Sequence, residues 1–333
     1  MKALIIAGGF GTRLRPLTDH VPKSLMPIAN RPFLEHQVRL LARHGVSEAV
    51  LLTGYLAAEF ETFIPRAAEI GVKVEISTED HPLGTAGAVR SRLEDLDDTA
   101  IVFNGDVLTD LDVSAMVEFH RARGSALSIA LTHVADAGAY GLVPLDAQGR
   151  IERFVEKPPP EIAALGGWIN AGTYVLEPRV LADIPPDTEW SFEYQVFPSL
   201  LERGEPMYGF QSDSYWIDIG TPQRYLQAHF DILSGRSNVE VGGRIIAESQ
   251  SFADGTTIEA PCLLDHAPVR PGAVIGPMVC LGAGALVGAG ARIERSVIHE
   301  EAEIGERAVV RDSIVGRGVR VEDDREVVGV TLA

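Results

Sequence analysis

The sequence predicts an α/β protein in which a Rossmann-like, mostly parallel sheet carries helices on both faces and precedes a left-handed parallel β-helix. Two observations lead to this prediction. Through about residue 230, short apolar segments alternate with amphipathic ones, as strands and helices do in a mostly parallel sheet. Beyond that point, aliphatic residues recur every six positions, which is typical of a β-helix whose aliphatic side chains point inward.

The N-terminal part reads as strand and helix in turn. An apolar stripe predicts the first helix, and Gly45 its end; the stripe consists of Phe33, Leu34, Val38 and Leu41. The expected strands are Lys2–Ala7, Ala49–Thr53, Val72–Ser77, Ala100–Asn104 and Ala126–His133. The expected helices are Pro32–His44, Ala57–Ala68, Ala86–Leu93 and Val113–Arg123. Ligands of such sheets bind beyond the carboxyl ends of the strands.

The C-terminal third carries the six-residue repeat. Its aliphatic positions are Val269, Ile275, Leu281, Val287 and Ile293, and Ile304 and Val310 resume it after an interruption. A flexible tail would not keep this register, so the repeat favours a β-helix. Glycines and polar residues loosen the chain before it. We therefore expect one domain over residues 1–233, a linker over 234–250 and the β-helix over 251–333.

The chain has two cysteines, Cys262 and Cys280, which give no disulfide framework or zinc pattern. They lie 18 residues apart, the length of three hexapeptides. However, the step from Leu264 to Val269 is one residue short of the period, so we expect the cysteines to be out of register, buried and free. The nine histidines show no spacing typical of a metal site or a catalytic triad.

Composition and charge exclude several classes of partner. The 333 residues are 46% hydrophobic and carry a formal net charge of −18, which argues against binding nucleic acid or an anionic membrane. No apolar run reaches the length of a membrane span, and the N-terminus lacks the apolar region of a signal peptide. The sequence therefore predicts a cytoplasmic protein with no membrane partner.

The loop after the first strand predicts a triphosphate site. Glycines let backbone amides approach an anion, and basic side chains beside them supply charge. The loop offers Gly8, Gly9, Gly11, Thr12, Arg13, Arg15 and Lys23. It is not a dinucleotide fingerprint, because Leu14 stands where the third glycine belongs, and the Gly-Lys-Ser/Thr of a P-loop is absent.

Two acidic residues are candidates for a Mg²⁺ site. Asp106 follows an apolar strand in the run Asn104-Gly105-Asp106, and Asp218 lies in the run Tyr215–Thr221. Mg²⁺ prefers one or two carboxylates, with phosphate oxygens and waters completing its shell. The alternative interpretation makes Asp106 a turn residue and Asp218 a helix cap.

The run of residues 9–18, GFGTRLRPLT, followed by Pro22-Lys23, resembles the sugar-phosphate nucleotidylyltransferase pattern G-x-G-T-R-L-x-P-L-T and P-K. The resemblance extends over essentially the whole chain, including the β-helix of longer members. It implies transfer of a nucleoside monophosphate from an NTP to a sugar 1-phosphate, with release of pyrophosphate. It also implies that Mg²⁺ is the cofactor and that Asp106 and Asp218 are its ligands.

The resemblance also assigns the other site residues. It implies catalytic roles for Arg13 and Lys23, which would stabilise and orient the phosphates. The nucleotide-binding residues would be Gly8, Gly9, Gly11, Thr12, Arg13, Gly84, Thr85 and Asn104. The sugar-phosphate-binding residues would be Gly141, Glu156, Lys157, Asn170 and Gly172, with Glu156 on a sugar hydroxyl and Lys157 on the phosphate.

Two segments are similar to those of mannose-1-phosphate guanylyltransferases. Residues 83–87, LGTAG, match their P-L-G-T-A-G loop, and residues 29–37 match their N-K-P-x-L-x-H-Q run. These matches imply GTP and mannose 1-phosphate as substrates. Tyr194 stands where relatives often carry Arg, which leaves the acceptor open.

Several alternatives remain at this point. The base and acceptor could be those of a glucose-1-phosphate thymidylyl-, uridylyl- or adenylyltransferase, or of a cyclitol-1-phosphate nucleotidyltransferase. A hexapeptide acyltransferase would account for the β-helix but would leave Arg13, Lys23 and both acids without a role. A nucleotide-sugar-binding regulatory subunit is the non-enzyme alternative. The open ends of the β-helix favour a homo-oligomer.

Overall fold

The structure is a computed structural model that describes residues 1–96 and 98–333. The chain forms two compact units. The first comprises Met1–Gly9 and Gln37–Trp216, and the second comprises Phe10–His36 and Ile217–Ala333. The segment that carries Arg13 and Lys23 therefore belongs to the same unit as the C-terminal repeats. The domain boundaries expected from chain order remain a proposal.

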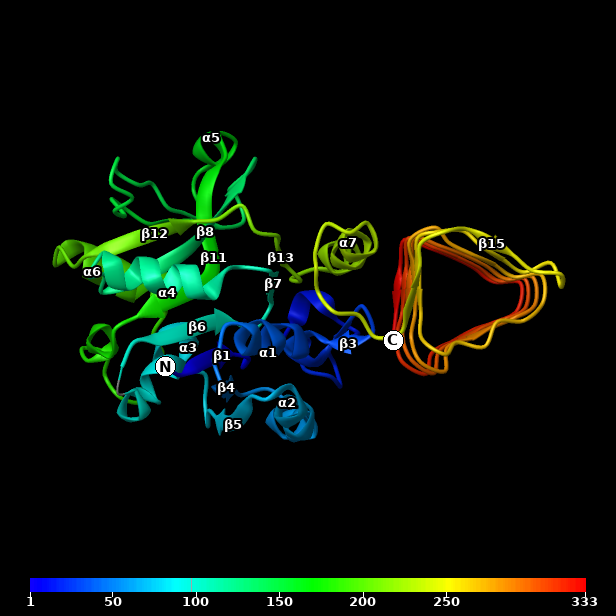
Figure 1. Cartoon of the computed structure of the whole chain (residues 1–333), viewed down its shortest axis with the longest axis horizontal. Coiled ribbons are helices and arrows are strands. Elements are labelled where there is room, and N and C mark those ends of the chain that lie inside the picture. Colours follow the sequence, from blue (N-terminus) through cyan, green and yellow to red (C-terminus); the bar gives the residue numbers. More distant parts are fainter. Residues whose placement is uncertain (97) are drawn as a thin grey trace. The chain divides into compact units, whose positions relative to one another are not determined.

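The first unit is built on a nine-stranded mixed sheet. Its order is β10-β9-β11-β6-β1-β4-β5, with β8 paired to both β11 and β12 (Figure 1). The strands are β1 Ala3–Ile6, β4 Glu48–Thr53, β5 Lys73–Thr78, β6 Ala100–Asn104, β8 Leu127–Val134, β9 Gly141–Leu142, β10 Val155–Glu156, β11 Gly167–Leu176 and β12 Met207–Gln211. Strand β1 pairs in parallel with both β4 and β6. The predicted α/β sheet is confirmed.

Strand β11 was not expected, and it makes the sheet mixed. It pairs antiparallel with β6 on one side and with β8 on the other. The strand is irregular at Asn170-Ala171-Gly172, because its register with β8 shifts between Asn170 and Tyr174. The strand nevertheless continues through the irregularity, because its residues on either side are buried in the sheet.

Four helices lie close to their expected positions: α1 Phe33–Arg43, α2 Ile64–Ile70, α3 Gly84–Arg90 and α4 Val113–Ala122. Helices α5 Pro160–Ala163 and α6 Phe197–Glu202 were not predicted from the sequence. Asp112 caps α4 by accepting a hydrogen bond from the Ala115 amide at 2.9 Å. The helix expected over residues 57–68 instead begins as a 3₁₀ segment, Ala57–Phe63, and becomes α-helical at Ile64. Across the described part of the chain, no helix combines the length and apolar character that a membrane span requires.

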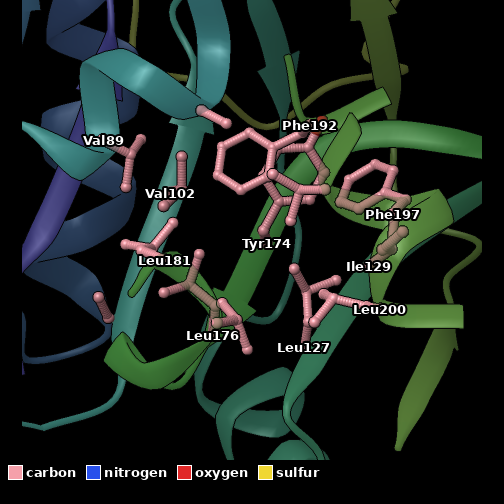
Figure 2. Packing of buried hydrophobic residues seen from close by; sticks show 14 of the residues in the cluster. Val89, Val102, Leu127, Ile129, Tyr174, Leu176, Leu181, Phe192, Phe197 and Leu200 are labelled. Atoms are coloured by element: carbon pink, nitrogen blue, oxygen red, sulfur yellow. The ribbon is translucent and has the colours of Figure 1, made fainter. Parts of the chain in front are cut away.

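The main apolar core of the first unit centres on three aromatic rings (Figure 2). The ring of Phe192 lies 5.1 Å from that of Tyr174 and 5.7 Å from that of Phe197, between centroids. Leu127, Ile129 and Leu176 are fully buried in the same cluster. Contacts of this kind add to the free energy gained by burying apolar area.

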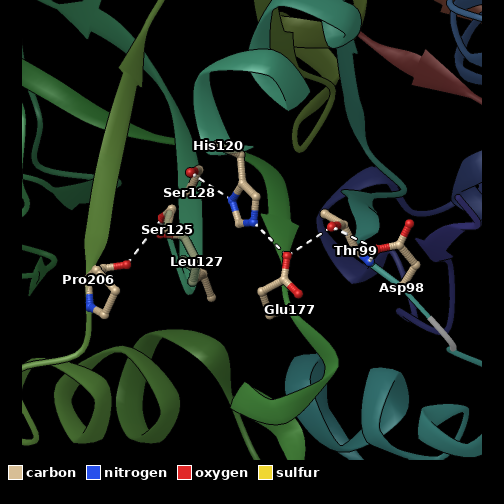
Figure 3. A network of polar contacts seen from close by, with 8 residues as sticks. All are labelled: Asp98, Thr99, His120, Ser125, Leu127, Ser128, Glu177 and Pro206. Carbon is tan, nitrogen blue, oxygen red and sulfur yellow. Dashed lines mark hydrogen bonds and ion pairs between the residues drawn. The ribbon is translucent and has the colours of Figure 1, made fainter. Parts of the chain in front are cut away.

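The first unit also contains a buried polar network (Figure 3). The carboxylate of Glu177 accepts from Thr99 at 2.8 Å and contacts His120 at 3.2 Å, and the other nitrogen of His120 lies 3.0 Å from Ser128. Ser, His and acid are joined here in the order of a hydrolase triad, which spacing along the chain did not suggest. Ser128 is fully buried, so no substrate reaches its hydroxyl and the network is structural.

The second unit contains the β-helix, whose three sheets form nested triangular turns in Figure 1. Their strands pair in parallel, except that β14 pairs antiparallel with β17 and β15 with β16. One sheet consists of β14 Arg244–Ile246, β17 Cys262–Leu264, β19 Val279–Leu281, β22 Val297–Ile298, β25 Ile314–Val315 and β28 Thr331–Leu332. The next consists of β15 Gln250–Ser251, β16 Thr257–Ile258, β18 Val274–Ile275, β21 Arg292–Glu294, β24 Val309–Arg311 and β27 Glu326–Val328. The third consists of β20 Leu286–Val287, β23 Glu303–Ile304 and β26 Arg320–Val321.

Most coils of the β-helix contain 17 residues, one fewer than three hexapeptides. Ile293 pairs with Val310 at that spacing, whereas Ile275 pairs with Ile293 at 18. This shortening explains the interruption of the repeat after Ile293. Six of the seven aliphatic repeat positions are buried, and the seventh, Val269, is partly buried against the same core, so their inward direction is confirmed.

The cysteines are out of register, as expected from the missing residue. Cys262 pairs with Val279 in the neighbouring coil, and Cys280 pairs with Leu263. Both thiols are free and buried. Burial raises the pKa of Cys262 to about 11 and raises that of Cys280 still further, so neither thiol ionises near neutral pH.

Helix α7 (Pro222–Leu233) and the β-helix enclose a buried polar cluster within the second unit. The Tyr225 hydroxyl donates to the Pro27 carbonyl and lies 2.9 Å from Nε2 of His299. Nδ1 of His229 lies 2.9 Å from the Tyr225 carbonyl. Burial lowers the pKa of His229 to about 4 and that of His299 to about 3, so both rings are neutral in the folded protein.

Acidification is expected to destabilise the second unit through these two histidines. Their folded pKa values lie below the ordinary value near 6.5, so the unfolded chain binds more protons as the pH falls from about 6.5 to about 4. The free energy of unfolding then decreases by about 1.4 kcal/mol per pH unit for each histidine. Urea unfolding followed by circular dichroism at about pH 7 and about pH 5 measures this loss.

The variant His299→Gln tests the source of the loss. Glutamine can still donate to the Tyr225 hydroxyl but cannot be protonated in this range, so the difference in unfolding free energy between the two pH values should shrink. His266→Gln is the matched control, because the His266 side chain is 93% exposed on the same β-helix. Equal pH dependence in the two variants would contradict the assignment.

Candidate active site

The residues predicted from the sequence divide between the two units, and each group is described within its own unit. The first unit holds Gly8, Gly9, Gly84, Thr85, Asn104, Asp106, Gly141, Glu156, Lys157, Asn170 and Gly172. The second holds Gly11, Thr12, Arg13, Lys23 and Asp218.

The carboxyl ends of β1 and β6 bring the first part of the site together. Ile6 at the end of β1 lies opposite Asn104 at the end of β6, and the Gly105 amide donates to the Ile6 carbonyl at 2.8 Å. The loop with Gly8 and the run ending in Asp106 therefore leave neighbouring strands at one edge, as parallel pairing requires. The Gln37 amide fixes this edge by donating to the Asn104 carbonyl at 2.8 Å.

Gly172 faces Asn104 from the bulge of β11. Its φ of 71° is left-handed, and a Cβ at this position would lie 2.8 Å from Nδ2 of Asn104. The Gly172 amide donates to Oδ1 of Asn170 at 2.9 Å, and Nδ2 of Asn170 donates to the Tyr174 hydroxyl at the same distance. Both the backbone angle and the close approach require glycine, so Asn104, Asn170 and Gly172 form one polar surface.

Two carboxylates, Glu156 and Glu193, lie within electrostatic range of each other beside this surface. Glu193 accepts hydrogen bonds from Ser191 at 2.5 Å and from Thr85 at 3.1 Å. Burial raises the pKa of Glu156, the charge of Glu193 raises it further, and Lys157 opposes the shift. Sequence reasoning missed Glu193; the acid in Ser191-Phe192-Glu193 was the signal that could have identified it.

Residues 83–87 pack closely on the backbone of residues 188–190. The Trp190 carbonyl accepts from the Ala86 amide at 2.8 Å and from the Gly87 amide at 3.1 Å. Gly84 has a φ of 69°, and a Cβ there would lie 2.6 Å from the same carbonyl. This contact fixes the start of α3 and places Thr85 against Glu193.

Strands β9 and β10 bring Gly141, Glu156 and Lys157 together. Gly141 pairs with Glu156, and a Cβ on Gly141 would lie 2.9 Å from Oε2 of that glutamate. The Lys157 amide donates to the Tyr140 carbonyl at 3.1 Å, and Lys157 itself has a φ of 47°. A left-handed conformation is uncommon for lysine and is maintained here by the surrounding contacts.

In the second unit, one compact loop carries Arg13 and Lys23. Gly11 has a φ of 60°, and its carbonyl accepts from the Thr18 hydroxyl at 2.9 Å, which closes the loop. A Cβ on Gly11 would lie 3.2 Å from Cβ of Lys23, so the glycine allows the two halves of the loop to meet. Arg13 lies in the 3₁₀ turn Thr12–Leu14 and is exposed.

Asp218 ends β13 (Trp216–Asp218) and lies beside two residues that sequence reasoning missed, Gly220 and Arg224. The Arg224 guanidinium forms an ion pair with Oδ1 of Asp218. A Cβ on Gly220 would lie 2.9 Å from Nη2 of Arg13 and 3.0 Å from Oδ2 of Asp218. Gly220 thus gives the Arg13 guanidinium and the Asp218 carboxylate room on the same side of the backbone.

The donor chemistry of Asp106 and Asp218 suits Mg²⁺, which binds carboxylate oxygens together with phosphates and water. Within residues 1–96 and 98–333, no group of three or more His, Cys, Asp or Glu side chains is arranged to hold a metal ion. Asp106 belongs to the first unit and Asp218 to the second. Their binding of one shared ion remains a prediction from the sequence.

Comparisons with known proteins cover almost the entire chain. Residues 2–235 match the family described as "Nucleotidyl transferase", and residues 257–333 match the "GMPPB C-terminal domain". The mannose-1-phosphate guanylyltransferase of Mycobacterium tuberculosis is 40% identical over 303 residues, which cover 83% of both chains. The UTP–glucose-1-phosphate uridylyltransferase of Synechocystis is 36% identical over 258 residues, which cover 73% of this chain and 66% of that protein.

A solved structure supports the fold of the N-terminal part. The crystal structure of HddC from Yersinia pseudotuberculosis in complex with GMP-PN is similar to this chain with a TM-score of 0.59 and 31% identity. The match covers 68% of this chain and 97% of HddC.

The substitution Glu193→Gln should lower the pKa of Glu156 toward the ordinary value. It removes a negative charge that opposes ionisation of Glu156, while the new amide oxygen can still accept from Thr85 and Ser191. Carbon-13 NMR titration of the glutamate side chains measures the shift. Glu189→Gln, at an exposed position on the same segment, is the matched control and should leave Glu156 unchanged.

Proposed function

The chain belongs to the nucleotidyl transferase family and is a sugar-1-phosphate nucleotidylyltransferase, and we propose that it transfers the GMP group of GTP to mannose 1-phosphate. The reaction forms GDP-mannose and releases pyrophosphate. The observation that carries the choice of substrates is the 40% identity to a mannose-1-phosphate guanylyltransferase over 83% of both chains. The C-terminal match to the GMPPB domain supports it.

The reaction requires positioning and charge neutralisation rather than a protein nucleophile. A phosphate oxygen of mannose 1-phosphate attacks the α-phosphorus of GTP, and the bond from that phosphorus to the bridging oxygen of pyrophosphate breaks. The phosphate monoester is already a sufficient nucleophile near neutral pH. The enzyme therefore gains rate by aligning two polyanions and by stabilising charge on the leaving pyrophosphate.

The polar surface of the first unit supports binding of the acceptor. We assign Glu156 and Asn170 to the sugar hydroxyls and Lys157 to the phosphate. Glu156 and Glu193 provide acceptors for hydroxyl groups, and Gly172 allows Asn104 to approach the bulge of β11 closely. Thr85, fixed by Glu193, links this surface to the loop that we assign to the nucleobase.

The loop of the second unit supports binding of the triphosphate. We assign Arg13 to the β- and γ-phosphates and Lys23 to the orientation of the phosphates around the reacting centre. In a chain of net charge −18, two cations on one closed loop provide a local attraction for the nucleotide. When bound, Mg²⁺ neutralises phosphate charge, and we expect Asp106 and Asp218 to hold it.

Arg224 has a role that the sequence did not predict. The ion pair fixes the orientation of the carboxylate beside Arg13. We propose that Arg224 acts through Asp218, as a residue that orients a metal ligand rather than one that contacts substrate.

A second pair of substrates, UTP and glucose 1-phosphate, is favoured by the similarity to the Synechocystis uridylyltransferase. Tyr194 stands where relatives often carry Arg, and it is 60% exposed. A tyrosine supplies no positive charge to an acceptor. A hexapeptide acyltransferase is not favoured, because His299 of the β-helix is buried against Tyr225 and cannot reach a substrate.

We also propose that the β-helix assembles copies of the chain through the exposed Val328 and Val330 of its final coil.

Pyrophosphate release in the presence of Mg²⁺ should be fastest with GTP and mannose 1-phosphate. The assay compares GTP, dTTP, UTP, CTP and ATP, each with mannose 1-phosphate and with glucose 1-phosphate. A higher kcat/KM for any other pair would replace the proposed substrates. Nucleotide binding without release for every pair would favour a cyclitol phosphate acceptor or a regulatory subunit.

Replacing Arg13 with alanine should lower kcat by about a hundredfold or more, because the charge developing on pyrophosphate loses its stabilising partner. Arg13 is exposed and lies on a closed loop, so the thermal unfolding temperature should not change. Arg43→Ala, at the exposed end of α1, is the control and should retain full activity. Near-normal turnover by the Arg13 variant would contradict its assigned role.

A further inference from the structure

The segment that follows Lys23 forms a tight hairpin of β2 (Pro27–Ile28) and β3 (Arg31–Pro32) within the second unit. Its two turn residues, Ala29 and Asn30, have φ angles of 49° and 62°. A two-residue turn with both φ angles positive suits the twist of a hairpin, but it is strained for alanine. Such a turn persists only where surrounding contacts hold it.

Contacts from three distant parts of the same unit hold this hairpin. The Asn30 side chain donates to the Leu281 carbonyl of the β-helix at 2.8 Å. The Gly242 amide donates to the Ala29 carbonyl at 2.8 Å, and a Cβ on Gly242 would lie 2.4 Å from the Asn30 carbonyl oxygen. The Tyr225 hydroxyl of α7 donates to the Pro27 carbonyl.

The β-helix also orients Tyr225. Because the single hydroxyl proton of tyrosine is given to Pro27, Nε2 of His299 must donate to the tyrosine oxygen, at 2.9 Å. Burial keeps both His299 and Tyr225 neutral, so this chain of hydrogen bonds has one direction, from His299 through Tyr225 to Pro27. His36 adds a further contact to the hairpin, at 3.0 Å from the Ile28 carbonyl.

The held hairpin lies directly after the turn that carries Lys23. The 3₁₀ turn Lys23–Leu25 ends where the Met26 amide donates to the Lys23 carbonyl at 3.2 Å, and the Met26 carbonyl accepts from the Phe33 amide at 2.8 Å. Met26 is 2% exposed, so buried packing restrains the backbone between Lys23 and the hairpin. A displacement of the hairpin therefore displaces the lysine.

We propose that Asn30, Tyr225 and His299 are positioning residues through which the β-helix holds Lys23 in place for phosphate transfer. The inference rests on the proposed function, because it assigns the hairpin a role in orienting the triphosphate. It gives the β-helix a part in catalysis within a single chain. A misplacement of about 1 Å at such a site can cost about a hundredfold in rate.

Two substitutions remove one or two hydrogen bonds from this support. Asn30→Gly keeps the left-handed turn and loses the bond to Leu281, and Tyr225→Phe keeps the buried ring and loses the bonds to Pro27 and His299. We expect kcat to fall about threefold to tenfold in each variant. The KM for the sugar phosphate should stay unchanged, because its assigned residues lie in the first unit.

A second measurement does not depend on turnover. Amine acylation followed by peptide mass spectrometry reports the reactivity of Lys23, with Lys2 and Lys73 of the first unit as internal references. We expect Lys23 to react at least about threefold faster in both variants, in the absence of substrates, because the segment that holds it is loosened. Asn238→Gly and Tyr208→Phe are the matched controls, at an exposed linker position and a half-buried strand position.

The two measurements separate failure of the inference from failure of the proposed function. Unchanged Lys23 reactivity and unchanged kcat in the folded Asn30→Gly variant would overturn the positioning role, whatever the substrates are. If wild-type protein releases no pyrophosphate with any pair, the proposed function fails. Increased Lys23 reactivity in the variants would even then support the positioning of Lys23 by the hairpin contacts. A variant that does not fold is replaced by His299→Phe, which keeps a buried ring but cannot donate to Tyr225, so Lys23 should react faster. Unchanged Lys23 reactivity in that folded variant would likewise overturn the positioning role.

Discussion

Parallel pairing of β1 with β6 is the constraint on which the first unit depends. Because both strands run in the same direction, their carboxyl ends meet at one edge, and the polar residues that follow them meet there as well. The strands themselves are apolar and buried, so the edge is the only part of either strand where polar groups can lie. Strand β11 then brings Asn170 and Gly172 to the same edge from the opposite direction.

The electrostatics of the site follow from how closely the backbone can approach. Glycine at 84, 141 and 172 removes the Cβ that would otherwise contact Trp190, Glu156 and Asn104. Burial raises the pKa of Glu156, and the nearby charge of Glu193 raises it further. At the acceptor site that we propose, a sugar hydroxyl between the two carboxylates would donate to them. Close backbone packing at the three glycines and the two carboxylate acceptors therefore belong to the same surface.

The β-helix has two roles in its unit. Its aliphatic core and stacked coils account for its own stability, as expected for a repeat structure in which each coil contacts its neighbours. Its side toward residues 27–30 is different, because there the Leu281 carbonyl accepts from Asn30 of a strained hairpin. The His299 ring acts on the same hairpin through Tyr225, which donates to the Pro27 carbonyl. The regular β-helix therefore supports the strained hairpin as well as its own coils.

The sequence by itself determined five strands and four helices of the α/β sheet, the β-helix and the family. Apolar period and glycine position decide these features locally, and the phosphate loop is contiguous from Gly8 to Lys23. Only the tertiary structure decided that β11 is a strand, that Glu193 lies within electrostatic range of Glu156, and that Asn30, Tyr225 and His299 together support one hairpin. Asn30 and Leu281 are 251 positions apart, Tyr225 and Pro27 are 198 apart, and Tyr225 and His299 are 74 apart. Side-chain contacts over such separations leave no periodic trace in the sequence.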